Sequence, residues 1–383
     1  MSLRKKLYTW HSWAGFQLAV LSFVVLLSGT LAVVSDEIDW LLDGERHISA
    51  FDGEPNWDAM YRNAQAVAPQ GKLVAMNLGE LPVMAAEARL SFGDRKLLRV
   101  FLDPRDGRVL GTGSWINVQR ILRDFHRYLF ILTKGLGLPI VTIVAVVLGV
   151  QLVTGLATTR KWMRGLITLP RRKNSRVFIG DLHRFAALWT TWFTLLIVVT
   201  SAWYFTEWGL QRAGVSIAAP LMATSEALSE RPTPVGSLQR HIDASKAVFP
   251  EMTVHNISLP TTRRNQVIIT GPSTDWLLRD RASRVTLDPG TAQVLAVQRP
   301  ADLDTLQYLA DLADPVHFGS FGGLTTKLLW FICGLLLTGL SASGVWLTWR
   351  RTRQTFGRWH LLTSVPIVAA VGLAINYASA YSL

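Results

Sequence analysis

Five stretches of the chain contain no Asp, Glu, Lys or Arg, and they constrain its fold more than any other feature. They cover residues 12–35, 135–159, 185–206, 328–349 and 359–383, and each holds 22 to 25 residues. About 20 apolar residues are enough for a helix to cross a bilayer. Only 17% of the residues are charged, whereas a soluble domain carries about a quarter. The sequence therefore predicts a membrane α-helical bundle of about five transmembrane helices embedded in a lipid bilayer.

The first and last of these runs differ from the rest. The first is too long for the core of a signal peptide and lacks a clear cleavage site, so we expect it to stay as a membrane anchor. The last is diluted by Pro366 and Asn376, among other small and polar residues, and is only a probable span.

The basic residues gather in alternate connecting segments. The N-terminus and the short segments 160–184 and 350–358 together hold 15 basic residues and one acidic residue, whereas the long segments 36–134 and 207–327 hold 24 basic and 26 acidic residues. Excess Lys and Arg in short loops is typical of the cytoplasmic side of a membrane. We expect a cytoplasmic N-terminus, with both long segments across the membrane. The net charge of +12 then reflects membrane topology and not nucleic-acid binding.

Two short elements recur at almost the same spacing along the chain. Residues 99–104 read RVFLDP and residues 284–289 read RVTLDP, while 152–156 read LVTGL and 336–340 read LLTGL. The offsets are 185 and 184 residues. The first pair predicts a strand that runs into an Asp-Pro turn. The chain is therefore expected to be duplicated, each half holding a span, an α+β outer domain and a second span.

These patterns predict the following division of the chain: a cytoplasmic start and helix 1 at 1–35, a first outer α+β domain at 36–125, helix 2 at 126–159, a basic loop at 160–182, helix 3 at 183–206, a second outer α+β domain at 207–316, helix 4 at 317–349, a basic loop at 350–358 and a probable helix 5 at 359–383.

Five of the eight histidines stand where a predicted span begins. His11, His183 and His360 open spans on the cytoplasmic side, and His126 and His317 open spans on the outer side. A single histidine at the mouth of a membrane helix is usually an interfacial polar residue. Recurrence at all five spans favours a function instead, since polar residues in membrane helices are costly.

The duplication pairs His11 with His183 and His126 with His317. Across a bundle, two imidazoles would then converge near each membrane face. We expect no acidic partner at these positions, which argues against a proton relay or a carboxylate–histidine metal site. The pattern predicts two b-type haems, each held by two histidines as axial ligands to the iron. His360 is a further candidate, either as the inner partner of His11 or His183 or as an interfacial residue.

The chain resembles the PepSY-associated transmembrane proteins of bacterial inner membranes. The resemblance rests on WHSWAGF at the first span, LHRFAAL at the third, the Thr-Gly pairs of the repeated spans and the LDP strand ends. That family includes ferric-siderophore reductases. The resemblance implies an inner-membrane oxidoreductase, with periplasmic PepSY-like outer domains, that passes electrons to a periplasmic ferric siderophore and releases Fe(II) for iron uptake. The four paired histidines match the family pattern, and the electron donor on the cytoplasmic side would be a quinol or a flavoprotein.

Two other functions stay open at this point. The chain could be a di-haem electron-transfer subunit that serves a protein partner. It could also be a non-redox PepSY-type protein that binds or regulates another protein, with its histidines interfacial. Four residues near the expected outer haem could orient a chelate: Arg123, Arg127, Tyr128 and Phe318.

Overall fold

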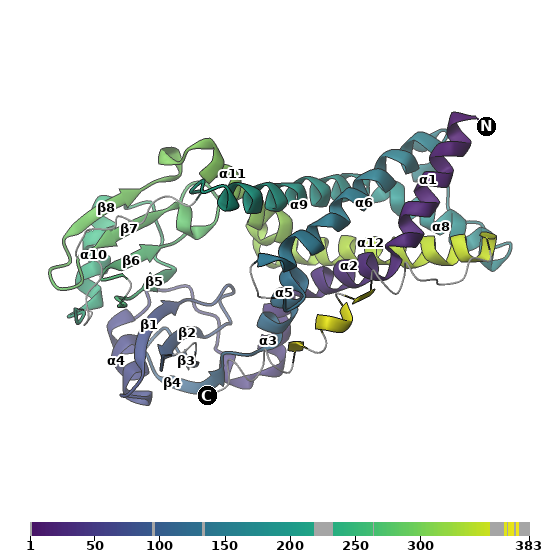
Figure 1. Cartoon of the computed structure of the whole chain (residues 1–383). Coiled ribbons are helices and arrows are strands. Elements are labelled where there is room, and N and C mark those ends of the chain that lie inside the picture. The colour runs from purple at the N-terminus through teal and green to yellow at the C-terminus, as the bar shows by residue number, and fades with distance from the viewer. Residues whose placement is uncertain are drawn as a thin grey trace.

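The structure is a computed structural model of the chain, and it describes residues 2–93, 96–131, 135–217, 233–262, 264–352, 364–365, 367–370 and 373–374. Long helices form a bundle at one end, and a sheet with two helices on it forms the other end (Figure 1). The end of the bundle near α11 and α5 is called the sheet end below, and the end that holds α1 and α8 is called the basic end.

Four charge-free runs, 12–35, 135–159, 185–206 and 328–349, form the most apolar helices of the bundle, because a helix satisfies its own backbone hydrogen bonds in an apolar environment. Among the described residues, three helices are long and apolar enough to cross a membrane, and the pair α1–α2, bent by 71°, makes a fourth if it is one span. The fifth predicted span lies mostly outside the described residues. The helices of the bundle are α1 (Leu3–Gln17), α2 (Ala19–Val33), α3 (Ser35–Leu42), α5 (Val118–Tyr128), α6 (Gly137–Thr158), α7 (Trp162–Ile167), α8 (Ser175–Trp189), α9 (Thr191–Arg212), α11 (Thr305–Phe318) and α12 (Gly323–Thr352).

The two halves of the chain repeat the same helix contacts. α1 packs on α6 in the first half, and α8 packs on α12 in the second. α5 likewise packs on α2, and α11 packs on α9. Between the halves, α6 packs on α9 and α12 packs on α2. Helices of each half thus pack both within their own half and on helices of the other half, as expected for a duplicated bundle whose two halves interlock.

The two long segments between the spans share one sheet. Among the described residues it has eight antiparallel strands in the order β4-β3-β2-β1-β5-β6-β7-β8. The first half supplies β1 (Lys72–Asn77), β2 (Ala86–Ser91), β3 (Leu97–Leu102) and β4 (Val109–Ser114), and the second half supplies β5 (Asn256–Ser258), β6 (Val267–Thr270), β7 (Arg284–Leu287) and β8 (Val294–Gln298).

The halves join at the centre of this sheet, where β1 pairs with β5 through Met76 opposite Ile257. The sequence predicts two separate α+β domains, whereas the structure shows one composite domain. The physical reason is that each four-stranded half would leave β1 or β5 as an open edge with unpaired backbone groups. Pairing the two edges satisfies both.

One face of the sheet holds the core of this domain. α4 (Trp57–Val67) and α10 (Leu238–Val248) cover it and touch each other. Side chains alternate along each strand, so that Val267, Ile269 and Val285 are buried beneath these helices. The intervening residues, among them Ile268, point to the opposite face, which is turned toward the bundle.

Short elements connect the sheet to the bundle. They are η1 (Gly44–Arg46), η3 (Asp280–Ala282), η4 (Pro300–Asp302) and η5 (Ser320–Gly322). Asp39 of α3 fixes the start of α5, because its carboxylate accepts hydrogen bonds from the backbone N–H groups of Val118 and Gln119. Lys327 of α12 forms ion pairs with Glu37 and Glu80, so that a bundle helix is tied to the loop before β2.

Candidate functional site

Two histidines meet at the sheet end of the bundle. His126 lies in the last turn of α5 and His317 in the last turn of α11, and their ring centroids are 6.4 Å apart. Both helices end at a residue with left-handed backbone, Leu129 after α5 and Gly319 after α11. The sequence places these histidines at the beginnings of spans. In the structure they lie instead on separate short helices that precede α6 and α12.

Two further histidines meet at the basic end. His11 and His183 each occupy the ninth position of a 15-residue helix, α1 and α8, and their ring centroids are 6.5 Å apart. The pairs that the duplication predicts are thus the pairs that lie together. His360, the fifth candidate, lies outside the described residues.

A neighbouring helix binds the Nδ1 atom of each sheet-end histidine. His126 Nδ1 lies 3.0 Å from the Val25 carbonyl oxygen, which can only accept, so Nδ1 carries the proton. His317 Nδ1 lies 2.8 Å from Thr200 Oγ1. The Thr200 hydroxyl already donates to the Leu196 carbonyl, so it accepts from His317. Both imidazoles therefore have a lone pair at Nε2 that no described residue engages in a hydrogen bond, and this is the atom needed for metal ligation.

The same arrangement recurs at the basic end. His11 Nδ1 lies 3.1 Å from the Gln151 carbonyl oxygen and 3.1 Å from Thr154 Oγ1. His183 Nδ1 lies 2.8 Å from Ser343 Oγ, whose hydroxyl donates to the Leu340 carbonyl. All four histidines consequently have the same tautomer, with the proton on Nδ1 and a free Nε2.

Glycines make room for three of these rings. A Cβ atom added to Gly29 would lie 2.6 Å from His126 Cε1, which is too close for any side chain. Added Cβ atoms at Gly155 and Gly344 would lie 3.3 and 3.4 Å from Cε1 of His11 and His183. Small residues at these positions let the helices approach and hold the imidazoles in place.

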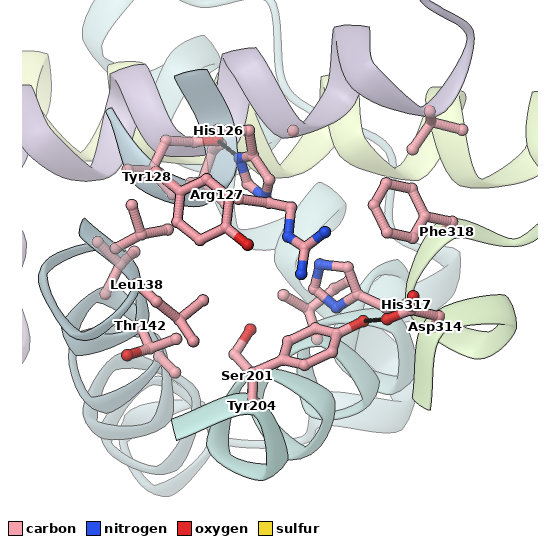
Figure 2. Close-up of a pocket in the computed structure, with 18 of the residues that line it drawn as sticks. His126, Arg127, Tyr128, Leu138, Thr142, Ser201, Tyr204, Asp314, His317 and Phe318 are labelled. Atoms are coloured by element: carbon pink, nitrogen blue, oxygen red, sulfur yellow. Dashed lines mark hydrogen bonds between the residues drawn. The ribbon is translucent and has the colours of Figure 1, made fainter. Parts of the chain in front are cut away.

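A cavity of about 430 Å³ opens beside the sheet-end pair. His126 and His317 project into it from opposite helices, and the side chain of Arg127 reaches toward His317 (Figure 2). Aliphatic side chains of α2, α6 and α12 line most of the wall. The polar part includes Tyr204, whose hydroxyl donates to Asp314 over 2.5 Å. A mostly apolar cavity with a few polar groups is typical of a cofactor site.

The donor set suits a haem better than a bare ion. Within the described residues, no three His, Cys, Asp or Glu side chains gather as they would around a metal ion. A pair of imidazoles supplies only two donors, which is what an iron with four macrocycle nitrogens needs. Two metal–nitrogen bonds of about 2 Å, plus roughly 1 Å from each nitrogen to its ring centroid, span about 6 Å. The observed separations of 6.4 and 6.5 Å fit that span.

Three other histidines lie among the described residues, outside the two pairs. His241 is buried, and both of its ring nitrogens bond to backbone carbonyl oxygens. His47 bonds to the Trp40 carbonyl. His255 differs, since it pairs with Asp280 and lines a second cavity.

Sequence reasoning found the histidines but missed their partners. Thr200 and Ser343 lie within apolar runs where nothing distinguishes them from other hydroxyl residues. Thr154 belongs to the repeated Thr-Gly pair, and that repeat is the one signal that pointed to a partner. Its counterpart in the second half, Thr338, lies near Thr30 and not near His183. The repeat therefore does not predict the hydrogen-bond partner of His183.

The family model of the PepSY-associated TM region matches residues 8–351 of the chain. The match begins just before His11 and ends within α12, so it covers all four paired histidines and both halves of the sheet. No curated protein matches the chain significantly.

Proposed function

The chain belongs to the PepSY-associated transmembrane family, and we propose that it is a haem-containing reductase of ferric siderophores. It would carry two b-type haems, one between His11 and His183 and one between His126 and His317. The proposal rests on the hydrogen-bonding pattern that the four imidazoles share. Each has its Nδ1 bound by a neighbouring helix and its Nε2 free.

The protein's own residues would hold and tune the cofactors. Val25 and Thr200 fix the tautomer and orientation of the sheet-end imidazoles, and hydrogen bonds of this kind also raise the basicity of a metal-bound histidine. The aliphatic side chains of the cavity wall would lower the polarity around a bound haem and so influence its reduction potential. The haem iron, once bound, would accept and release single electrons.

The reaction would be one-electron reduction of Fe(III) to Fe(II) in the chelate. Hard oxygen donors hold Fe(II) less tightly than Fe(III), so reduction releases the iron. The electron would come from a quinol or a flavoprotein at the basic end. The concentration of Lys and Arg in the short loops supports an inner-membrane protein whose basic end is cytoplasmic and whose sheet is periplasmic.

Two measurements on the purified full-length protein test this function. Reduction with dithionite should produce the split α and β bands of low-spin b-type haem, at two haems per chain. A protein without these bands would refute the haem assignment. Anaerobic mixing of the reduced protein with a ferric hydroxamate such as ferrioxamine B should then reoxidise the haem. Failure of every ferric chelate tried would instead favour an electron-transfer subunit with a protein partner.

A further inference from the structure

A second cavity lies between the sheet and the bundle. Its volume is about 720 Å³, within the range of sites that take drug-sized ligands. Its walls come from β5, β6 and β7 on the sheet side, and from α5, α11 and the start of α12 on the bundle side. This cavity is called the chamber below.

The chamber contains arginines that no carboxylate neutralises. Among the described residues, Arg279, Arg281 and Lys327 form ion pairs with acidic side chains. Arg264 and Arg284 form none. Arg284 donates to the neutral side-chain amide oxygen of Gln298 at 2.6 Å, and the buried Nε of Arg264 has no hydrogen-bond partner. Burial lowers the pKa of Arg264, and burial together with the charge of Arg281 lowers the pKa of Arg284. Two guanidinium groups held this way are suited to donate hydrogen bonds to oxygen atoms that carry negative charge.

The duplication shows that the missing counter-ion is specific to the second half. Arg99 of β3 occupies the position equivalent to Arg284 of β7, and Glu87 of β2 forms an ion pair with it at 3.3 Å. Glu87 stands opposite Phe101, two residues after Arg99. The residue in the same register of β6 is Ile268, which stands opposite Thr286. An isoleucine therefore replaces the carboxylate, and it does so on the face that lines the chamber.

The chamber shares a wall with the cavity beside the sheet-end pair. Arg279, Asp314 and Phe318 line both cavities, so a single layer of side chains separates them. The Phe318 ring meets His317 edge-on at 5.7 Å, and its face carries the guanidinium of Arg123 at 4.7 Å. A molecule in the chamber is thus one aromatic ring away from a histidine of the sheet-end pair.

We propose that the chamber is the docking site for a ferric chelate, in which Arg264 and Arg284 donate hydrogen bonds to the oxygen atoms bound to iron. This inference rests on the proposed function. The ligand class is a chelate of the hydroxamate or catecholate type, because the oxygens bound to the metal keep partial negative charge and have further lone pairs that can accept hydrogen bonds from outside the complex. Trp276 and Phe321, which pack together at 5.6 Å and line the chamber, supply apolar contacts for the ligand backbone.

A redox-inert probe separates docking from electron transfer. Gallium(III) has the charge and nearly the size of Fe(III) but accepts no electron under these conditions. Its uncharged complex with the cyclic trihydroxamate desferrioxamine E therefore reports binding alone. Equilibrium dialysis against the detergent-purified full-length protein, with bound gallium measured by mass spectrometry, gives the affinity. The test variant is Arg264→Gln with Arg284→Gln. The control variant is Arg62→Gln with Arg240→Gln, which changes two exposed arginines on α4 and α10.

We expect the test variant to lose about tenfold or more in affinity, with the control unchanged and the haem spectrum of both as in the wild type. Equal binding by the test variant would overturn the docking site and leave the proposed function in place. So would a wild type that does not bind the gallium complex although ferrioxamine E still reoxidises its haem. Absence of haem would overturn the proposed function alone, because gallium binding does not depend on electron transfer.

A second variant tests the same site by adding a carboxylate to it. Ile268→Glu restores the carboxylate that the first half has at Glu87, and we expect it to pair with Arg284 and weaken gallium-complex binding to a similar degree. Full haem content will show that this variant is folded. An Ile268→Glu protein with normal haem content and unchanged affinity would contradict the role of Arg284.

Discussion

Replacing Thr200 by valine removes the acceptor of the His317 Nδ1–H while keeping a side chain of nearly the same shape. The hydrogen bond is 2.8 Å long, and Thr200 is only 7% exposed. A buried donor left without a partner costs about 1–3 kcal/mol. Loss of such a partner from a metal-bound histidine lowers metal affinity by about 10–100-fold. The two magnitudes agree, because each 1.4 kcal/mol changes an equilibrium roughly tenfold.

Thr194→Val is a matched control on the same helix. Thr194 is also 7% exposed, and its hydroxyl donates to the Thr190 carbonyl, just as that of Thr200 donates to the Leu196 carbonyl. Only Thr200 contacts a histidine of the sheet-end pair. We expect haem titration of the apoprotein to show two binding steps, of which Thr200→Val weakens one by about 10–100-fold. If Thr200→Val weakens haem binding no more than Thr194→Val, the hydrogen bond does not position a ligand.

Three further outcomes follow from the same geometry. His126→Ala should remove about half of the haem measured as the pyridine haemochromogen, and undiminished haem would refute the pairing. Gly29→Ala should weaken the same haem site, because its Cβ would lie 2.6 Å from His126, whereas Gly149→Ala meets only an ordinary contact at 3.6 Å and should not. Although burial acts to lower it, the hydrogen bond and charge of Asp280 raise the pKa of His255 above its ordinary value of 6.5. His255 therefore stays protonated in the chamber up to a higher pH. Binding of the gallium complex should be constant below about pH 6.5 and weaken as pH rises through that higher pKa, and a flat profile would exclude this contribution.

The bundle could be predicted from the sequence because its signals are local. A charge-free run of more than 20 residues has few alternatives to a membrane helix. The histidine pairs could also be predicted, since WHSWAGF and LHRFAAL place His11 and His183 at equivalent positions of equivalent helices. Repetition along the chain thus identified residues that meet in space, although they are 172 positions apart.

The composite sheet could not be predicted in this way. Its central pairing joins β1 to β5, which has only three residues and carries no distinct strand pattern. Strand pairing over such a distance depends on the tertiary fold and not on local preference. The same is true of the hydroxyl partners. Thr200 becomes a partner of His317 only because α11 packs against α9.

Duplication and divergence act at different places in this molecule. The histidine pairs keep the symmetry of the halves, because each pair takes one histidine from an equivalent helix of either half, and under the proposed function the two would hold one haem between them. The sheet departs from that symmetry at Glu87 and Ile268, where one half neutralises its arginine and the other leaves it facing the chamber. The joining of β1 to β5 makes this departure useful, since it fixes both halves in one rigid surface above the bundle. In each histidine pair the two halves supply equivalent residues, whereas docking of a single ligand, as proposed for the chamber, requires one half to differ from the other.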